Sequence, residues 1–291
     1  MTFRYPLQMN TTKEFLDKLR DVARVHLTPC GEGEMIWRAW GNPDASAIVL
    51  LHGGFGAWNH WVRNINALAA DHHVFAPDLP GCGDSDDPPG TPDAECLAKI
   101  LSDGLDRIIP DDAPFDLVGF SFGGLLAGPI ARAQMRRARS VTIVGTPILG
   151  LTTTGPANAL QPVPAGFAPE DAAPIYRRNL EKLMVHDPGA VDELAMTLHM
   201  ANMAKNRLRS RGIARRTIAA DSMRGLTCPL GFVYGDGDVT LDPDLDAVRA
   251  AASEIQPDAP FRVFADTGHW VQYEAADAFN ALLPTLLSAR A

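Results

Sequence analysis

One serine in the chain is flanked by glycines in a pattern suited to nucleophilic catalysis. Ser121 lies in the stretch Gly-Phe-Ser-Phe-Gly-Gly at 119–124, directly after the apolar run Phe115–Val118. A G-x-S-x-G sequence between a strand and a helix is typical of a sharp turn that raises the serine hydroxyl above a sheet. Such a turn strains the backbone, so its neighbours need to lack bulk. We therefore predict that Ser121 is a nucleophile and that a helix follows it over 124–135.

Two stretches downstream carry the base and the acid that such a serine requires. A histidine must take the serine proton, and a carboxylate must fix the tautomer of that histidine. His269 follows the apolar run Phe261–Phe264, and two carboxylates follow the run Leu230–Tyr234. The order serine, acid, histidine is one that serine hydrolases use. We predict that His269 is the base.

Either of the two carboxylates could orient His269, and we favour Asp238 over Asp236. Both belong to the sequence Tyr-Gly-Asp-Gly-Asp at 234–238. Asp236 occupies a position where Asp-Gly commonly has a purely structural role in a turn. The stretch 141–169 contains no carboxylate, which removes the preceding strand as a source of the acid.

A second glycine-rich stretch predicts an oxyanion hole. His-Gly-Gly-Phe-Gly at 52–56 follows the apolar run Ala47–Leu51. Glycines allow backbone N–H groups to approach a developing negative charge closely. We expect the N–H groups of Gly54 and Phe122 to be the donors, and we expect His52 to brace the loop.

The composition excludes several classes of function. A net charge of −9 and a pI of about 5.3 argue against a nucleic-acid partner. No apolar run approaches the length of a membrane span, and the first twenty residues do not resemble a secretory leader. The four cysteines are scattered, which favours free thiols in a cytoplasmic protein. No H-E-x-x-H or G-x-G-x-x-G motif occurs, so we expect no metal and no cofactor, only a small-molecule substrate. The oligomeric state stays open, with a homodimer as one option.

Short apolar runs alternate with longer helical stretches, which indicates an α/β fold with a mostly parallel, doubly wound sheet. Many of the motifs above follow such runs, and the carboxyl edge of a parallel sheet is where ligands bind. The predicted strands are Met35–Ala39, Ala47–Leu51, His73–Ala76, Phe115–Val118, Val141–Val144, Leu230–Tyr234 and Phe261–Phe264.

The spacing of the strands breaks once. About 85 residues separate Val144 from Leu230, too many for a single crossover. This stretch is predicted to be helical over 171–216, with an interruption at 187–189. We therefore expect a helical cap at 148–225, inserted after the sixth strand of the fold, and a core domain made of 1–147 and 226–291.

The expected cap carries an island of positive charge on an acidic chain. Between Leu194 and Ala220 there is no Asp or Glu, but there are six basic residues. One or two of these arginines could bind a substrate carboxylate through paired hydrogen bonds. A solvated helix face is the alternative explanation for most of them.

These motifs together resemble the α/β-hydrolase superfamily over most of the chain. The resemblance rests on HGGFG at 52–56, DLPGCGDSD at 78–86, GFSFGG at 119–124, YGDGD at 234–238 and TGHW at 267–270. The resemblance implies an α/β-hydrolase fold and a Ser-His-Asp hydrolase.

Two longer stretches, 177–188 and 268–280, are similar to the meta-cleavage-product hydrolases, which cut C–C bonds in 2-hydroxy-6-oxo-dienoates. The similarity implies that Trp270 lines the substrate site and that a cap arginine, with Arg207 as the nearest match, holds a substrate carboxylate. Phe55 and Phe120 are the other predicted substrate contacts. Those enzymes usually carry Asn before the nucleophile, whereas this chain carries Phe120, which cannot hydrogen-bond a dienoate.

Three functions therefore remain open. A carboxylesterase and a C–C bond hydrolase would share Ser121, His269 and Asp238, and would differ in the leaving group. The third is a small-molecule receptor built on a hydrolase scaffold, although a receptor has no need of an intact triad. Dehalogenases and epoxide hydrolases of this fold use Asp where this chain has Ser121.

Overall fold

The computed structural model describes residues 12–150, 160–214 and 218–288, and eight strands in these ranges form a single sheet. The strands are β1 Arg24–Cys30, β2 Gly33–Trp40, β3 Ala47–Leu51, β4 His73–Pro77, β5 Phe115–Phe120, β6 Ala138–Val144, β7 Leu230–Gly235 and β8 Phe261–Phe264.

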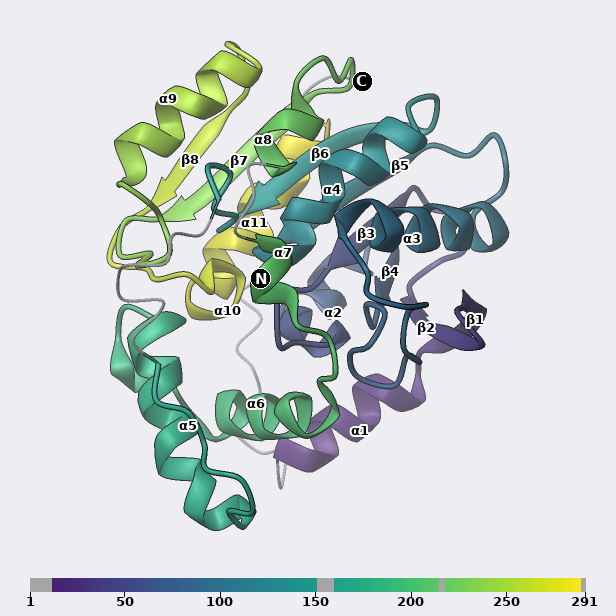
Figure 1. The fold of residues 1–291 in the computed structure, drawn as a ribbon. Coiled ribbons are helices and arrows are strands. Elements are labelled where there is room, and N and C mark those ends of the chain that lie inside the picture. Colours follow the sequence, from purple (N-terminus) through teal and green to yellow (C-terminus); the bar gives the residue numbers. More distant parts are fainter. Residues whose placement is uncertain (1–11, 151–159, 215–217, 289–291) are drawn as a thin grey trace.

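The order of the strands in the sheet is β1-β2-β4-β3-β5-β6-β7-β8 (Figure 1). Strand β2 pairs antiparallel with both β1 and β4, and all later pairs are parallel. Parallel neighbours end at the same edge, so the residues that follow β3, β5, β7 and β8 lie at one edge of the sheet. The predicted α/β class and mostly parallel sheet are confirmed.

The seven predicted strands all occur, but β1 was not predicted. Its burial alternates only weakly, and Val25 and Leu27 are more than half exposed. Strand β1 lies at the edge of the sheet and pairs only with β2, through a tight turn at 31–32. An edge strand with Pro29 and a solvated face lacks the apolar run by which the buried strands are recognised.

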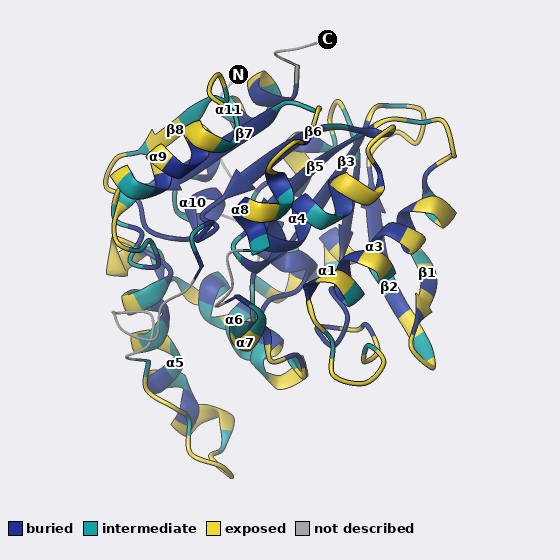
Figure 2. Ribbon diagram, turned by 45° about the horizontal axis from the view of Figure 1, so that its top comes forward, coloured by how far each residue is buried: buried dark blue, intermediate teal, exposed yellow. Residues whose placement is uncertain are grey.

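The two faces of the sheet bury alternate residues in two separate cores. Val49 and Leu51 of β3 belong to one core, whereas Ile48 and Leu50 belong to the other. Figure 2 shows the inner strands β3 to β7 as almost uniformly buried, while the edge strands β1 and β8 and the outer sides of the covering helices are exposed in part. The first core contains α3 Ala94–Ile108, α4 Phe122–Ala133, α8 Ile218–Met223 and α9 Leu245–Ile255; the second contains α1 Thr12–Asp21, α2 Ile65–Leu68, α10 Val271–Glu274 and α11 Ala276–Ser288.

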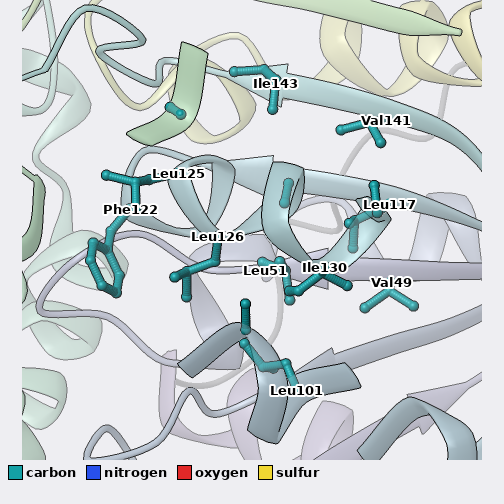
Figure 3. Close-up of a cluster of buried hydrophobic side chains, with 14 of the residues drawn as sticks. Val49, Leu51, Leu101, Leu117, Phe122, Leu125, Leu126, Ile130, Val141 and Ile143 are labelled. Atoms are coloured by element: carbon teal, nitrogen blue, oxygen red, sulfur yellow. The ribbon is translucent and has the colours of Figure 1, made fainter. Parts of the chain in front are cut away.

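Helix α4 lies directly on the sheet and holds the turn at Ser121 in place. Its apolar side chains pack onto Leu51, Leu117 and Ile143 of three neighbouring strands (Figure 3). The helix begins at Phe122, two residues before the predicted start, so it starts immediately after Ser121. The N-terminal end of α4, with its unpaired N–H groups, therefore faces the same edge of the sheet as the serine.

The segment between β6 and β7, residues 145–229, is called the β6–β7 segment below. Its described helices are α5 Pro169–Leu183, α6 Glu193–Lys205, α7 Ser210–Ala214 and α8, with a short 3-10 turn at Pro188–Ala190 where the interruption was predicted. Asp192 caps α6 by accepting the N–H of Ala195 at 2.8 Å. Helices α5 and α6 lie beside each other beyond one end of the sheet, and α8 packs against α4 (Figure 1).

Two polar contacts attach α6 to the stretch that follows β3. The side-chain amides of Asn59 and Asn202 are both buried and exchange two hydrogen bonds, at 2.9 and 2.8 Å. The guanidinium of Arg63 donates to Asp192 at 2.6 Å.

The division of the chain into a core domain and a cap stays a prediction. In the described part of the chain, no helix combines the length and apolar character needed to cross a membrane.

A buried ion pair holds the loop after β4. Asp78 is 1% exposed and accepts the Arg38 guanidinium at 2.9 Å, and it also accepts the backbone N–H groups of Trp58 and Asp84. Arg38 itself is 6% exposed. Asp78 thus ties β2 to the stretch after the glycine loop at 52–56.

Replacing Asp78 with alanine should lower the free energy of unfolding by about 3–5 kcal/mol. The change leaves the buried Arg38 guanidinium with Asp84 as its other carboxylate partner, and it leaves the backbone N–H groups of Trp58 and Asp84 without an acceptor. The exposed pair Lys99–Asp103 offers the control, and Asp103→Ala should cost about 0–1 kcal/mol. Urea denaturation monitored by circular dichroism measures both values. Equal losses in the two variants would show that the Asp78 contacts contribute no more than a surface pair.

Candidate active site

Three strand ends bring the predicted catalytic side chains together. Ser121 follows β5, Asp238 lies three residues after β7, and His269 lies in the loop after β8. These strands belong to the parallel half of the sheet, where β5, β6, β7 and β8 are successive neighbours. Residues more than one hundred positions apart in the sequence therefore meet at one edge.

The backbone at Ser121 has the strained geometry that the glycine pattern predicted. Its φ is +52° and its ψ is −113°, outside the regions that L-residues normally occupy. A Cβ on Gly119 would lie 2.5 Å from Gly124 Cα, and a Cβ on Gly123 would lie 2.5 Å from the carbonyl oxygen of Leu51. Both positions therefore require glycine, and the turn presents the half-buried Ser121 side chain at the sheet edge.

A hydrogen-bonded chain connects the three side chains. His269 Nε2 lies 2.9 Å from Ser121 Oγ, and His269 Nδ1 lies 2.8 Å from Asp238 Oδ2. Both Asp238 and His269 are buried. With a proton on Nδ1 donated to the carboxylate, Nε2 is left as the acceptor of the Ser121 hydroxyl proton. This is the geometry that general-base activation of a serine requires.

Thr240 fixes the carboxylate of Asp238, a role that the sequence analysis missed. Its backbone N–H and its hydroxyl both donate to Asp238 Oδ1, at 2.9 and 2.7 Å. Its Oγ1 also lies 3.1 Å from His269 Nδ1. One carboxylate oxygen is thus held by Thr240, and the other is directed at the histidine.

Asp236, the alternative acid, points elsewhere. It is exposed, and its carboxylate lies 3.4 Å from the backbone nitrogen of Thr267, in the turn between the two loops. The structure brings Asp238 to His269 and leaves Asp236 in a structural position.

The glycine loop at 52–56 lies against the turn that carries Ser121. A Cβ on Gly53 would lie 3.2 Å from the Cβ of Ser121, so the loop and the turn are in contact. Within the described residues, the N–H groups of Gly54 and Phe122 have no hydrogen-bond partner. Two N–H donors beside a serine hydroxyl can accommodate a developing oxyanion.

Two histidines hold the backbone of Gly53. His52 Nδ1 lies 2.7 Å from the Gly53 carbonyl oxygen, and its Nε2 accepts the Leu79 N–H at 2.9 Å. His60 Nδ1 accepts the Gly53 N–H at 3.3 Å. Burial lowers the pKa of His52 and lowers the pKa of His60 well below its usual value, so both rings are neutral at neutral pH. The bracing role expected for His52 matches this geometry, whereas the importance of His60 was missed.

A cavity of about 470 Å³ adjoins the hydrogen-bonded chain. Gly54 and Trp270, the neighbour of His269, line this cavity, whereas Ser121 is not among its lining residues. Phe55 and Trp270, both predicted substrate contacts, line it together with several apolar side chains of the β6–β7 segment, namely Leu160, Pro162, Val163, Leu180, Leu183, Met184 and Met203.

Two other predicted substrate contacts do not line this cavity. Phe120 is fully buried beneath the site, with its ring 5.0 Å from the ring of His269 and 5.6 Å from that of His60. The Arg207 guanidinium lies outside the cavity, where its Nε donates to Asp87 at 2.6 Å. The backbone N–H groups of Arg207 and Leu208 both donate to the carbonyl of Gly81, which holds this arginine on the loop after β4.

The cavity contains polar groups that the sequence did not single out. Arg211 lines it, with its guanidinium carbon 5.7 Å from the centre of the Phe55 ring. His199 lines it too, and burial lowers the pKa of His199 to about 4. The charge island between Leu194 and Ala220 contains Arg211, but spacing alone does not tell which basic residue turns inward.

The fold and the site define an α/β protein with a hydrogen-bonded serine, histidine and aspartate at the carboxyl edge of its sheet. The alpha/beta hydrolase family model matches residues 48–282, and the chain belongs to this family of enzymes.

Relatives of this chain include enzymes named as hydrolases of unsaturated 2-hydroxy-6-oxo acids. A 2-hydroxy-6-oxononadienedioate/2-hydroxy-6-oxononatrienedioate hydrolase from Paraburkholderia phymatum is 28% identical, with 89% of each chain covered. A 2-hydroxy-6-oxo-6-phenylhexa-2,4-dienoate hydrolase from Burkholderia cepacia is also 28% identical, over 95% of this chain and 96% of the relative. The crystal structure of esterase RhEst1 from Rhodococcus sp. ECU1013 has a TM-score of 0.76 at 22% identity, covering 91% of this chain and 98% of that one. This last likeness concerns the fold alone.

Proposed function

We propose that the protein is a serine hydrolase in which Ser121 is the nucleophile, His269 the general base and Asp238 the residue that orients the base. The single observation that carries this proposal is the continuous hydrogen-bonded chain from Ser121 Oγ through His269 to Asp238, at 2.9 and 2.8 Å. The strained turn at Ser121 and the two N–H donors beside it support the same assignment.

The geometry suits an acyl transfer in two halves. Ser121 Oγ attacks the substrate carbonyl carbon while His269 Nε2 takes the hydroxyl proton, and Asp238 stabilises the resulting imidazolium. The N–H groups of Gly54 and Phe122 donate to the carbonyl oxygen as it becomes negative. His269 then gives its proton to the leaving group, and an acyl group stays on Ser121. Water, deprotonated by His269, attacks this acyl group and restores the serine hydroxyl. The nucleophile, the base, the carboxylate that orients the base and the oxyanion donors all belong to the polypeptide.

An acyl-trapping experiment tests this proposal. The protein is mixed with p-nitrophenyl acetate, and the release of p-nitrophenolate is followed on the millisecond scale. A burst followed by a slower steady rate is expected, and peptide mass mapping after acid quench should find the acetyl group on Ser121. An acetyl group on another residue contradicts the assignment of the nucleophile. Absence of any turnover across short acyl esters and a keto-dienoate supports the receptor instead.

The substrate, in this proposal, has an apolar body and a carboxylate. The β6–β7 segment serves as a cap that supplies most of the residues lining the cavity, many of them apolar, and Arg211 supplies a guanidinium at its wall. A guanidinium can bind a carboxylate through two parallel hydrogen bonds. The role first expected for Arg207 therefore passes to Arg211, because Arg211 lines the cavity and Arg207 does not.

The variant Arg211→Gln should raise KM for a carboxylate-bearing ester, p-nitrophenyl hemiglutarate, by about 10- to 100-fold, since a hydrogen bond to a charged group contributes about 1.5–3 kcal/mol. KM for the neutral p-nitrophenyl butyrate should change little. Arg207→Gln is the matched control and should leave KM for both esters near the wild-type values. A KM increase for hemiglutarate in the Arg207 variant alone would restore Arg207 as the carboxylate ligand.

Hydrolysis of a C–C bond in a keto-dienoate is the second candidate. The observation that favours it is the 28% identity to two dienoate hydrolases over 89% and 95% of this chain. Against it stands Phe120, a buried ring without hydrogen-bonding groups. A comparison of kcat/KM for a ring-fission product with that for p-nitrophenyl butyrate separates the two activities. A carboxylesterase would leave the ring-fission product intact.

A further inference from the structure

A carboxylate outside the hydrogen-bonded chain gathers three backbone N–H groups next to His269. Glu274 is the last residue of α10, five positions after His269. Its Oε2 accepts the N–H of Gly268 at 2.7 Å, and its Oε1 accepts those of His186 and Asp187 at 2.9 and 2.7 Å. Hydrogen bonds to an ionised acceptor are about twice as strong as neutral ones. These three backbone N–H groups therefore hold the Glu274 carboxylate in place.

The three donors come from two different parts of the chain. Gly268 immediately precedes His269, whereas His186 and Asp187 follow helix α5 in the β6–β7 segment. The two backbones are in direct contact, because a Cβ on Gly268 would lie 2.5 Å from the carbonyl carbon of Val185. The N–H of Trp270 also donates to the carbonyl of Met184 at 2.6 Å. Glu274 thus clamps the loop that carries His269 onto the segment that follows α5.

The same clamp reaches the loop that carries Asp238. The carbonyl of Thr267 and the N–H of Gly268 belong to one planar peptide unit and point in opposite directions. The carbonyl accepts the N–H of Gly237 at 2.9 Å, and the N–H donates to Glu274. This peptide unit is therefore held at both ends. Because Gly237 adjoins Asp238, the orientation of the peptide sets how the histidine loop faces the aspartate loop.

We propose that Glu274 is a positioning residue, which keeps His269 in line with Asp238 by fixing the peptide unit between Thr267 and Gly268. This role rests on the proposed function of His269 as the general base. Without the carboxylate, the N–H of Gly268 loses its acceptor, and the histidine loop can rotate about the bond to Gly237. A displaced general base lowers kcat even when the substrate binds with unchanged affinity.

The variant Glu274→Gln tests this role, because its amide keeps the size of the side chain but turns one acceptor into a donor that faces backbone N–H groups. Asp277→Asn, an exposed carboxylate three residues further on, is the matched control. Titration with a fluorophosphonate to its end point counts the protein molecules that have a reactive serine. The rate is divided by this number, so unfolded protein does not lower kcat. For p-nitrophenyl butyrate, kcat per titrated site should fall about 10- to 100-fold in Glu274→Gln, the cost of displacing a catalytic group by about 1 Å. KM should stay within about threefold of the wild type, since substrate contacts are unchanged.

A second readout separates failure of this proposal from failure of the proposed function. The proton shared by His269 Nδ1 and Asp238 should give a downfield NMR resonance, assigned by its absence from His269→Ala. This resonance should persist in Asp277→Asn and be lost or shifted in Glu274→Gln. If the wild type is inert but the resonance responds in this way, the hydrolase assignment fails and the positioning role stands. If Glu274→Gln matches Asp277→Asn in both kcat per site and resonance, Glu274 has no positioning role.

Discussion

Replacing Ser121 with alanine is expected to lower kcat for p-nitrophenyl butyrate by about 10⁵- to 10⁶-fold, as loss of the nucleophile does in serine hydrolases. The variant retains His269 and the two N–H donors but has no hydroxyl to form the acyl intermediate. Its fold should be intact, because the half-buried Ser121 side chain contacts His269 and fills little space. Stopped-flow measurement of p-nitrophenolate release gives the rate, and the initial burst should vanish.

Ser253→Ala is the control for this experiment. Ser253 is exposed on α9 and is not part of the hydrogen-bonded chain of Ser121, His269 and Asp238, so its loss should leave kcat and the burst unchanged. Retention of more than about one per cent of wild-type kcat in Ser121→Ala would point to a nucleophile other than Ser121. Thermal unfolding of both variants verifies that the comparison concerns folded protein.

Replacing Asp238 with asparagine is expected to lower kcat by about 10⁴-fold. The asparagine amide can donate a hydrogen bond to His269 Nδ1, which favours the tautomer with its proton on Nε2. In that tautomer Nε2 can no longer accept the proton of the Ser121 hydroxyl. Thr240 would still donate to the side-chain oxygen, so the position of the side chain should change little. Steady-state kinetics with p-nitrophenyl butyrate measure the loss.

The comparison variant is Asp236→Asn, which makes the same chemical change two residues away. Asp236 is exposed, and its carboxylate faces the Thr267 backbone rather than an imidazole, so kcat should stay within about threefold of the wild type. A large loss in Asp236→Asn together with an active Asp238→Asn would reverse the assignment of the acid.

The placement of these three side chains could be predicted from sequence because each follows a parallel strand with an apolar run, and two of the three strands, β5 and β7, are fully buried. All six residues of β5 and all six of β7 are buried. Strands buried in this way are recognised in a sequence as nearly continuous apolar runs. The glycines at 119 and 123 mark the turn, because no other residue fits there. The edge strand β1 lacked both signals, and it was missed.

The walls of the cavity could not be predicted in the same way. Whether Arg207 or Arg211 faces the substrate depends on where α6 ends and how the chain then crosses the loop after β4. His60 was missed because it lies on a short 3-10 turn, Trp58–Trp61, which has no hydrophobic periodicity. Its role follows from contacts with Gly53 and Trp270, and the latter lies more than two hundred residues away.

Phe120 shows a further limit of motif comparison. Phe120 immediately precedes Ser121 and was predicted to contact substrate. In this chain it is the last residue of β5, and its ring fills the core between His60, Trp61 and His269. An apolar ring gains by complete burial, whereas an amide would have to find hydrogen-bond partners there.

The paired amides of Asn59 and Asn202 restrict how new specificities can be built on this scaffold. A chimera that received the stretch 145–229 from another hydrolase would leave Asn59 buried without a partner unless the donor supplied an equivalent of Asn202. The same holds for Arg63 and Asp192. Recombination should therefore exchange each of these pairs together. Random libraries should concentrate on apolar residues of the cavity wall, such as Leu183 and Met203, whose side chains need no hydrogen-bond partner.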